Sequence, residues 1–184
     1  MVADFAENYR CCHQDEIQSA YYQYQQVTIH PIVAYYRCDK CEDIVCESAV
    51  FISGDLVHDA YADEQFTRSY EEYLKETGME IEKEVLFSDG CASQYKSKLP
   101  FYFLSKHGSN FERAYFGSRH GKGPCDGVGG VVKKSAETFV KGRQGVIRTP
   151  KEFFDYCQKY LQKGKSNITE DCVHKKTCIF MLNA

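Results

Sequence analysis

The sequence has no tryptophan, only four prolines and no apolar run close to the ~20 residues that a membrane-spanning helix requires. The missing run excludes a helical membrane protein. The N-terminus also lacks the apolar segment of a secretory signal, so we expect a protein that is not exported. Internal repeats, low-complexity tracts and proline-rich linkers are absent too, which favours a single domain for 184 residues.

Each half of the chain is short of charge of one sign. Residues 1–90 contain 6 Lys and Arg against 19 Asp and Glu, whereas residues 91–184 contain 17 against 7. The net charge of −3 hides this division. The pattern fits two solvated faces of opposite sign, and it also fits a surface of the C-terminal half that binds a polyanion. Charge alone leaves both interpretations open.

The sequence contains ten cysteines, but it has apolar residues enough for a core and no export signal, which favours reduced thiols over a disulfide scaffold. Cys38 and Cys41 have the C-x2-C spacing of a zinc knuckle. A structural zinc needs two further ligands, for which the candidates are Cys11, Cys12, His13 and Cys46. The alternative is that these thiols are small hydrophobic side chains of the core.

Periodicity and capping signals predict an α/β fold with a mixed five-stranded sheet flanked by helices. The strands are expected at 1–6, 27–37, 47–53, 84–88 and 112–118, and the helices at 60–77, 91–107, 126–141 and 149–164. Pro31 indicates that its strand lies at an edge or carries a bulge, and Pro100 should bend or split its helix. In such sheets, ligands bind at the C-terminal ends of the parallel strands.

Three aspartates lie where this plan places functional groups. Asp4 is on the first strand, Asp89 closes the fourth, and Asp126 opens the helix after the fifth, with 36 residues between the last two. Converging carboxylates repel one another, and oxygen-only clusters suit Mg²⁺ or Mn²⁺, which act on phosphate substrates. Taken singly, Asp89 and Asp126 also fit turn or cap residues. The joint pattern with Asp4 favours a metal cluster.

Three segments resemble the acidic motifs of DDE/D transposases, enzymes of the cut-and-paste type with an RNase H-like catalytic core. They are DFAENY at 4–9, FSDGCASQYKSK at 87–98 and RHGKGPCDGVGGVVKK at 119–134. The resemblance implies that Asp4, Asp89 and Asp126 bind two Mg²⁺ or Mn²⁺ ions. It also implies attack of water on a DNA phosphodiester, followed in a transposase by attack of the freed 3′-hydroxyl on target DNA.

The same resemblance implies how the chain is organised and what it meets. Residues 1–145 would form the RNase H-like core, with a cysteine-bearing hairpin at about 36–48, and residues 146–184 a C-terminal helical extension of the same domain. The expected enzyme is a nuclease-type phosphoryl transferase with DNA as partner, no membrane, no small-molecule cofactor, and a homo-oligomeric full-length form. It would be nuclear in a eukaryote and intracellular otherwise. The alternative is a domesticated, catalytically silent module that binds DNA or protein.

Further residues are candidates for chemistry around the acids. His120 could orient the scissile phosphate, assist proton transfer or join the metal shell, or it could be a turn histidine. Glu137, deeper in the same helix as Asp126, competes for the role of third acid. A cysteine hydrolase, with Cys91 as nucleophile and His120 as base, would leave the aspartates unexplained.

Basic residues near the acids are candidates for DNA contacts. Lys133 follows Asp126 by two helical turns, which places both on one helix face. Tyr95 would suit a flipped base, although a solvated helix face is equally consistent with its neighbours. The other candidates for phosphate contacts are Lys96, Lys98 and Lys122.

Overall fold

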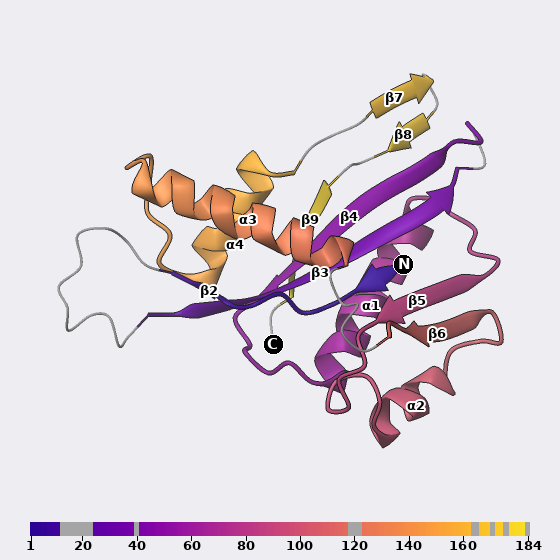
Figure 1. The fold of residues 1–184 in the computed structure, drawn as a ribbon. Helices are drawn as coiled ribbons and strands as arrows, with labels where there is room; N and C mark the ends of the chain where they lie inside the picture. Colours follow the sequence, from indigo (N-terminus) through magenta and orange to yellow (C-terminus); the bar gives the residue numbers. More distant parts are fainter. Residues whose placement is uncertain are drawn as a thin grey trace.

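The computed structural model describes residues 1–11, 24–38, 41–117, 123–162, 166–169, 172–174 and 177–182 (Figure 1). Its strands are β1 Val2–Ala3, β2 Tyr9–Arg10, β3 Gln26–Arg37, β4 Ile44–Ser53, β5 Glu84–Ser88, β6 Phe111–Tyr115, β7 Ser166–Thr169, β8 Cys172–His174 and β9 Thr177–Leu182. Its helices are α1 Ala60–Glu76, α2 Lys98–Leu104, α3 Pro124–Lys141 and α4 Pro150–Tyr160.

Seven of these strands form one mixed sheet in the order β6-β5-β1-β3-β4-β9, with β2 pairing to β3 beside this path. The strands β1, β5 and β6 are parallel, whereas β3 is antiparallel to both β1 and β4. The mixed α/β sheet expected from the sequence is therefore confirmed. The expected number of five strands is wrong, because β2 and β9 join the sheet as well.

Helices cover both faces of the sheet. In Figure 1, α3 and α4 lie on one side of β3 and β4, and α1 lies on the other. Side chains of β3 alternate between the two cores, since Val27 and Ile29 pack with α3 and α4 while Ile32 and Ala34 pack with α1. A strand that is buried on both faces needs apolar residues at successive positions, which is why β3 reads as an almost continuous apolar run.

The two helices with the clearest terminal signals begin where the sequence predicts. Asp59 caps α1 by accepting hydrogen bonds from the backbone of Tyr61 and Ala62, both at 3.0 Å, and Gly78 follows its end with φ +83°. Thr149 caps α4 through the amide of Glu152 at 3.1 Å, and Pro150 occupies the first turn. Local capping chemistry therefore sets both starts.

Pro31 lies in a central strand, which corrects the expectation of an edge position. It pairs with Val50 of β4 on one side, and on the other it faces the point where β1 ends. Beyond the Ala3–Ile32 pair, the five residues 4–8 lie opposite the four residues 28–31 before pairing resumes at Tyr9. The first strand thus bulges where Pro31 has no amide hydrogen to donate, and Asp4 lies at the start of the bulge.

The close approach of α3 to this bulge depends on a glycine. A Cβ added to Gly129 would lie 2.8 Å from the Cβ of Ala6, closer than two carbon atoms can pack. A Cβ on the next residue, Gly130, would meet nothing within 4 Å. Gly129 is therefore required by packing against the bulge, whereas Gly130 has no such constraint.

Other expectations need correction. Only Lys98–Leu104 of the expected helix 91–107 is helical, and Pro100 lies in its first turn, where proline is tolerated. Residues 146–184 are not wholly helical, because α4 is followed by β7, β8 and β9, the last of which pairs with β4 in parallel. None of the helices in the described ranges is long and apolar enough to cross a membrane.

The two neighbouring glycines of α3 predict opposite effects of the same substitution. Gly130→Ala should raise the free energy of unfolding by about 1 kcal/mol, because alanine favours a helix over glycine by that amount. Gly129→Ala should lower it by about 1 to 3 kcal/mol, because the new methyl group collides with Ala6. Urea unfolding of both variants checks this, and equal effects would contradict the close packing of α3 on the bulge.

Candidate functional site

Asp4 and Asp89 lie opposite each other, just beyond the C-terminal ends of two neighbouring parallel strands. Asp4 follows β1 and Asp89 follows β5, two parallel neighbours whose register pairs Val2 with Phe87. Two residues further along, the register therefore brings Asp4 opposite Asp89, on strands spaced about 4.8 Å apart. Both side chains line one polar groove of about 490 Å³, together with Phe5, Ala6, Glu7, Asn8, Arg10, Gln26, His58 and Gln94.

The electrostatics of Asp4 show that the acids act on one another. Burial raises the pKa of Asp4, and the negative charge of Asp89 raises it further. Asp126 also raises this pKa, although its effect is the smallest of those that act on Asp4. Three carboxylates from separate parts of the sequence thus share one electrostatic environment, in which a positive ion would relieve their repulsion.

Asp126 reaches this environment through the start of α3. It lies in the first turn of the helix and is exposed to solvent. Its neighbour Cys125 is buried, and its thiol, which has one hydrogen to donate, lies 3.3 Å from the carbonyl oxygen of Val2 and 3.4 Å from that of Pro31, which holds the helix N-terminus over β1 and β3. Glu137, the competing third acid, is exposed further along α3 and pairs with Lys141 at 3.2 Å.

The Oδ1 atoms of Asp4 and Asp89 are both fixed by hydrogen bonds. The Asp4 Oδ1 accepts from its neighbour's amide, Phe5 N, at 2.9 Å and from the Tyr95 hydroxyl at 3.4 Å. The Asp89 Oδ1 accepts from the amide of Cys91 at 2.7 Å. The described hydrogen bonds of both carboxylates leave the Oδ2 atoms out. Carboxylate oxygens are the ligands that Mg²⁺ and Mn²⁺ prefer, so the donor set fits these ions.

The described acids do not surround one ion position as a closed metal site would. Within the described ranges, no group of three or more His, Cys, Asp or Glu side chains is arranged around a single ion position. The exposed position of Asp126 agrees with this, because Asp126 is not among the residues that line the groove. The structure thus brings Asp4 and Asp89 together and places Asp126 within electrostatic reach.

The lysines differ in how they relate to the groove. Lys133 of α3 forms an ion pair with Glu7, which lines the groove, at 3.3 Å. Lys96 is folded back over the loop after Asp89. A Cβ added to Gly90 would lie 2.9 Å from the Lys96 ammonium group, and the same ammonium group lies 4.5 Å from the centre of the Tyr115 ring. Lys98 is exposed in the first turn of α2.

The cysteine-bearing hairpin forms where the sequence predicts. Cys38 and Cys41 lie in the turn between β3 and β4, and Cys46 is exposed on β4 opposite Tyr35. Cys11 bonds through its amide to Gln25, before the other end of β3, and is buried in the core. A strand of twelve residues is about 40 Å long, so an ion held by Cys38 and Cys41 is out of reach of Cys11.

Four residues with predicted roles, Cys12, His13, His120 and Lys122, lie outside the described ranges. The cysteine-hydrolase alternative therefore has no described base. The Cys91 thiol itself lies 3.2 Å from the hydroxyl of Ser93.

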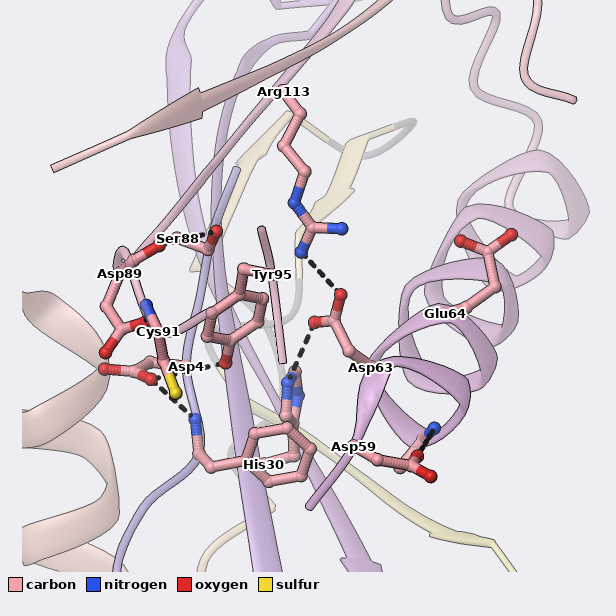
Figure 2. Close-up of polar contacts among 12 residues, drawn as sticks. Asp4, His30, Asp59, Asp63, Glu64, Ser88, Asp89, Cys91, Tyr95 and Arg113 are labelled. Atoms are coloured by element: carbon pink, nitrogen blue, oxygen red, sulfur yellow. Dashed lines mark hydrogen bonds and ion pairs between the residues drawn. The ribbon is translucent and has the colours of Figure 1, made fainter. Parts of the chain in front are cut away.

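A buried polar network beneath Asp4 has no counterpart in the sequence analysis. Figure 2 shows Tyr95 beside Asp4, and Asp63 between Arg113 and His30. Arg113 donates to Asp63, and His30 Nε2 lies 3.5 Å from the second oxygen of the same carboxylate. Burial alone would raise the pKa of Asp63, but His30 and Arg113 outweigh burial and the pKa is lowered. Asp63 is therefore an ionised side chain in the core.

The predicted role of Tyr95, stacking on a flipped base, is wrong. The residue is fully buried, so it cannot stack on a base.

The chain belongs to the family described as "Domain of unknown function (DUF8701)", whose model matches residues 1–180. No curated protein and no solved structure matches the chain. The description of the family assigns no activity, so the chemistry of the site must be argued from its own residues.

The mutual influence of the acids predicts a measurable shift. Asp89→Asn removes a negative charge that raises the pKa of Asp4, so this pKa should fall, and Asp126→Asn should lower it by a smaller amount. Titration of the Asp4 carboxyl carbon by NMR measures both changes. Asp155→Asn, on the exposed surface of α4, is the matched control. An unchanged pKa in Asp89→Asn would show that the two carboxylates do not interact.

Proposed function

We propose that this protein cleaves DNA strands with the help of divalent cations, as the catalytic core of a DDE/D transposase or a protein derived from one. The observation that carries the proposal is the meeting of Asp4 and Asp89 at the C-terminal ends of two parallel strands, with Asp126 acting on Asp4 from the first turn of α3. The spacing and motifs of these three acids are those that the sequence resemblance singles out.

The strand order supports an RNase H-like arrangement. An antiparallel hairpin, β3–β4, lies on one side of β1, and the parallel strands β5 and β6 lie on the other. Helices α1 and α2 make the connections into β5 and β6, and α3 then returns over β1 with the third acid. The first strand is thus central, Asp89 lies opposite the residue that follows it, and Asp126 raises the pKa of that residue by a smaller amount.

The chain's own residues divide the work of phosphoryl transfer. Asp4 and Asp89 would hold cations through oxygens that face the groove, and Asp126 would close the set when DNA and ions bind. Two ions bound there would activate the attacking oxygen and stabilise the leaving oxygen. Lys96 and Lys133 would contact phosphates on either side of the acids. Mg²⁺ and Mn²⁺ are the ions expected, and DNA is the expected substrate.

Charge distribution supports a polyanionic substrate. Residues 91–151 contain 12 Lys and Arg against 3 acids, and this stretch includes both α2 and α3. The acids concentrated in the first half of the chain would repel DNA, so the groove would need cations as well as lysines to hold it. Metal and DNA binding are therefore expected to support each other.

Nicking of supercoiled DNA with Mn²⁺ tests the catalytic assignment. The unmodified protein should nick, and Asp89→Asn should reduce the rate at least a hundredfold, because it removes a metal ligand, while Asp155→Asn should leave the rate unchanged. Asp89→Asn should bind DNA as well as or better than the parent, since it also removes a negative charge. Equal nicking by the parent and Asp89→Asn would overturn the assignment. Salt-dependent binding with no nicking by any variant would favour the catalytically silent alternative.

The ion pair between Glu7 and Lys133 predicts opposite changes in DNA affinity. Lys133→Ala should weaken binding to all sequences and reduce the slope of log affinity against log salt by about 0.9, because one phosphate contact is lost. Glu7→Gln should strengthen binding at low salt, because it releases the lysine from its 3.3 Å partner. Fluorescence anisotropy at several salt concentrations measures both. An affinity for DNA that does not change with salt concentration would contradict the proposal that lysines bind the DNA phosphates.

A further inference from the structure

Tyr95 occupies an unusual position for a polar side chain. It is fully buried in the turn segment between β5 and α2, and its backbone is fixed on both sides. Its amide donates to the carbonyl of Cys91 at 2.8 Å, and its carbonyl accepts from the hydroxyl of Tyr115 at 2.9 Å. The Tyr95 hydroxyl donates to Asp4 Oδ1 at 3.4 Å. The whole residue is thus held in place around a single contact with the acid of the first strand.

The hydroxyl of Tyr95 can only act as a donor here. Its described partner, Asp4 Oδ1, is a carboxylate oxygen, which accepts a hydrogen bond from the phenol. The residue is fully buried, so a hydroxyl that gave up this acceptor would lose a hydrogen bond without gaining one from water. The contact with Asp4 therefore limits how that carboxylate can turn.

The aromatic ring of Tyr95 contacts a positively charged side chain. The Arg113 guanidinium lies 5.1 Å from the ring centre, which is within the range of a cation–π contact. Arg113 is in turn held by Asp63, and Asp63 by His30, and these three side chains are at most 6% exposed. Figure 2 shows the ring of Tyr95 between Arg113 and Asp4. β6, α1 and β3 therefore all contribute to holding one tyrosine.

Stability alone gives a weak reason for this arrangement. A buried ion pair is often no more stable than apolar side chains of the same volume, because both charges must be removed from water. Its value lies in orientation: the planar guanidinium fixes the plane of the ring, and the ring fixes the hydroxyl. Without the Tyr95 hydroxyl, the carboxylate of Asp4 would be held only by the Phe5 amide, which donates to the same Oδ1 atom at 2.9 Å.

We propose that Tyr95, braced by Arg113, Asp63 and His30, is a positioning residue that fixes the carboxylate of Asp4 for divalent-cation binding. This inference rests on the proposed function, since it assigns the orientation of one acid of the groove. Tyr95 directs Oδ1 of Asp4 toward the interior and leaves Oδ2 for the groove. Residues that orient a metal ligand in this way commonly contribute 10- to 100-fold to metal affinity.

The test is the affinity for Mn²⁺ itself, followed by electron paramagnetic resonance of the free ion. Tyr95→Phe removes only the hydroxyl and should weaken Mn²⁺ binding about tenfold. The matched control is Tyr70→Phe. Tyr70, on α1, is also fully buried, and its hydroxyl donates at 2.8 Å to a carboxylate, that of Glu47 on β4. Tyr70→Phe should keep the Mn²⁺ affinity of the parent. The rise in melting temperature with Mn²⁺ gives a second readout that holds even for a less stable variant.

The outcomes separate the inference from the function on which it rests. If Tyr95→Phe binds Mn²⁺ like the parent while Asp89→Asn loses binding, the metal site stands and the role of Tyr95 is overturned. If Tyr95→Phe and Tyr70→Phe lose affinity equally, the effect is general loosening of the core, which also overturns it. If the parent binds no Mn²⁺, or Asp89→Asn binds it equally well, the proposed function fails together with the inference.

Discussion

The amide hydrogen that Pro31 lacks decides where the first strand stops. In a central strand, each backbone group normally meets a partner on both sides, and a proline interrupts this on one of them. Here the interruption falls opposite Asp4, where the regular ladder of β1 ends and residues 4–8 bulge, still bonded to β3 through the amides of Asp4 and Ala6, before β2 resumes the pairing. The bulge supplies most of one wall of the groove, and it is also the surface on which Gly129 lets α3 settle. The position of two of the three acids therefore follows from one backbone group.

The two faces of the sheet contribute differently to the groove. On the α3 side, the buried contacts are apolar or involve the Cys125 thiol, and an ion pair between Lys133 and Glu7 lies at the surface. On the α1 side, the core contains charges, because Asp63 of α1 meets His30 and Arg113 there. Asp4 and Asp89 thus lie at the C-terminal ends of the parallel strands, with a mainly apolar core on the α3 side of the sheet and buried charged residues on the α1 side.

Local signals in the sequence were enough to predict most of the elements, and the long-range ones were not. Capping by Asp59 and Thr149 depends on residues two or three positions apart, so α1 and α4 could be located from sequence alone. The strand β9 depends on pairing with residues more than a hundred positions earlier, which leaves no local pattern. The acids were predictable because strand ends and their spacing are visible in sequence. The network behind Asp4 was not, since its members come from four separate segments and meet only through the fold.

One edge of β4 stays open while most of the chain is still being synthesised. β4 ends at Ser53, but its parallel neighbour β9 begins only at Thr177, and ribosomes add roughly 5 to 20 residues per second. During synthesis, a ten-residue strand with a largely buried sequence therefore waits about 6 to 25 seconds for its partner. β4 is paired with β3 on one side, but its other edge is a template for pairing with other chains until β9 is made. The nascent protein is thus expected to be most prone to aggregation before residues 177–182 leave the ribosome.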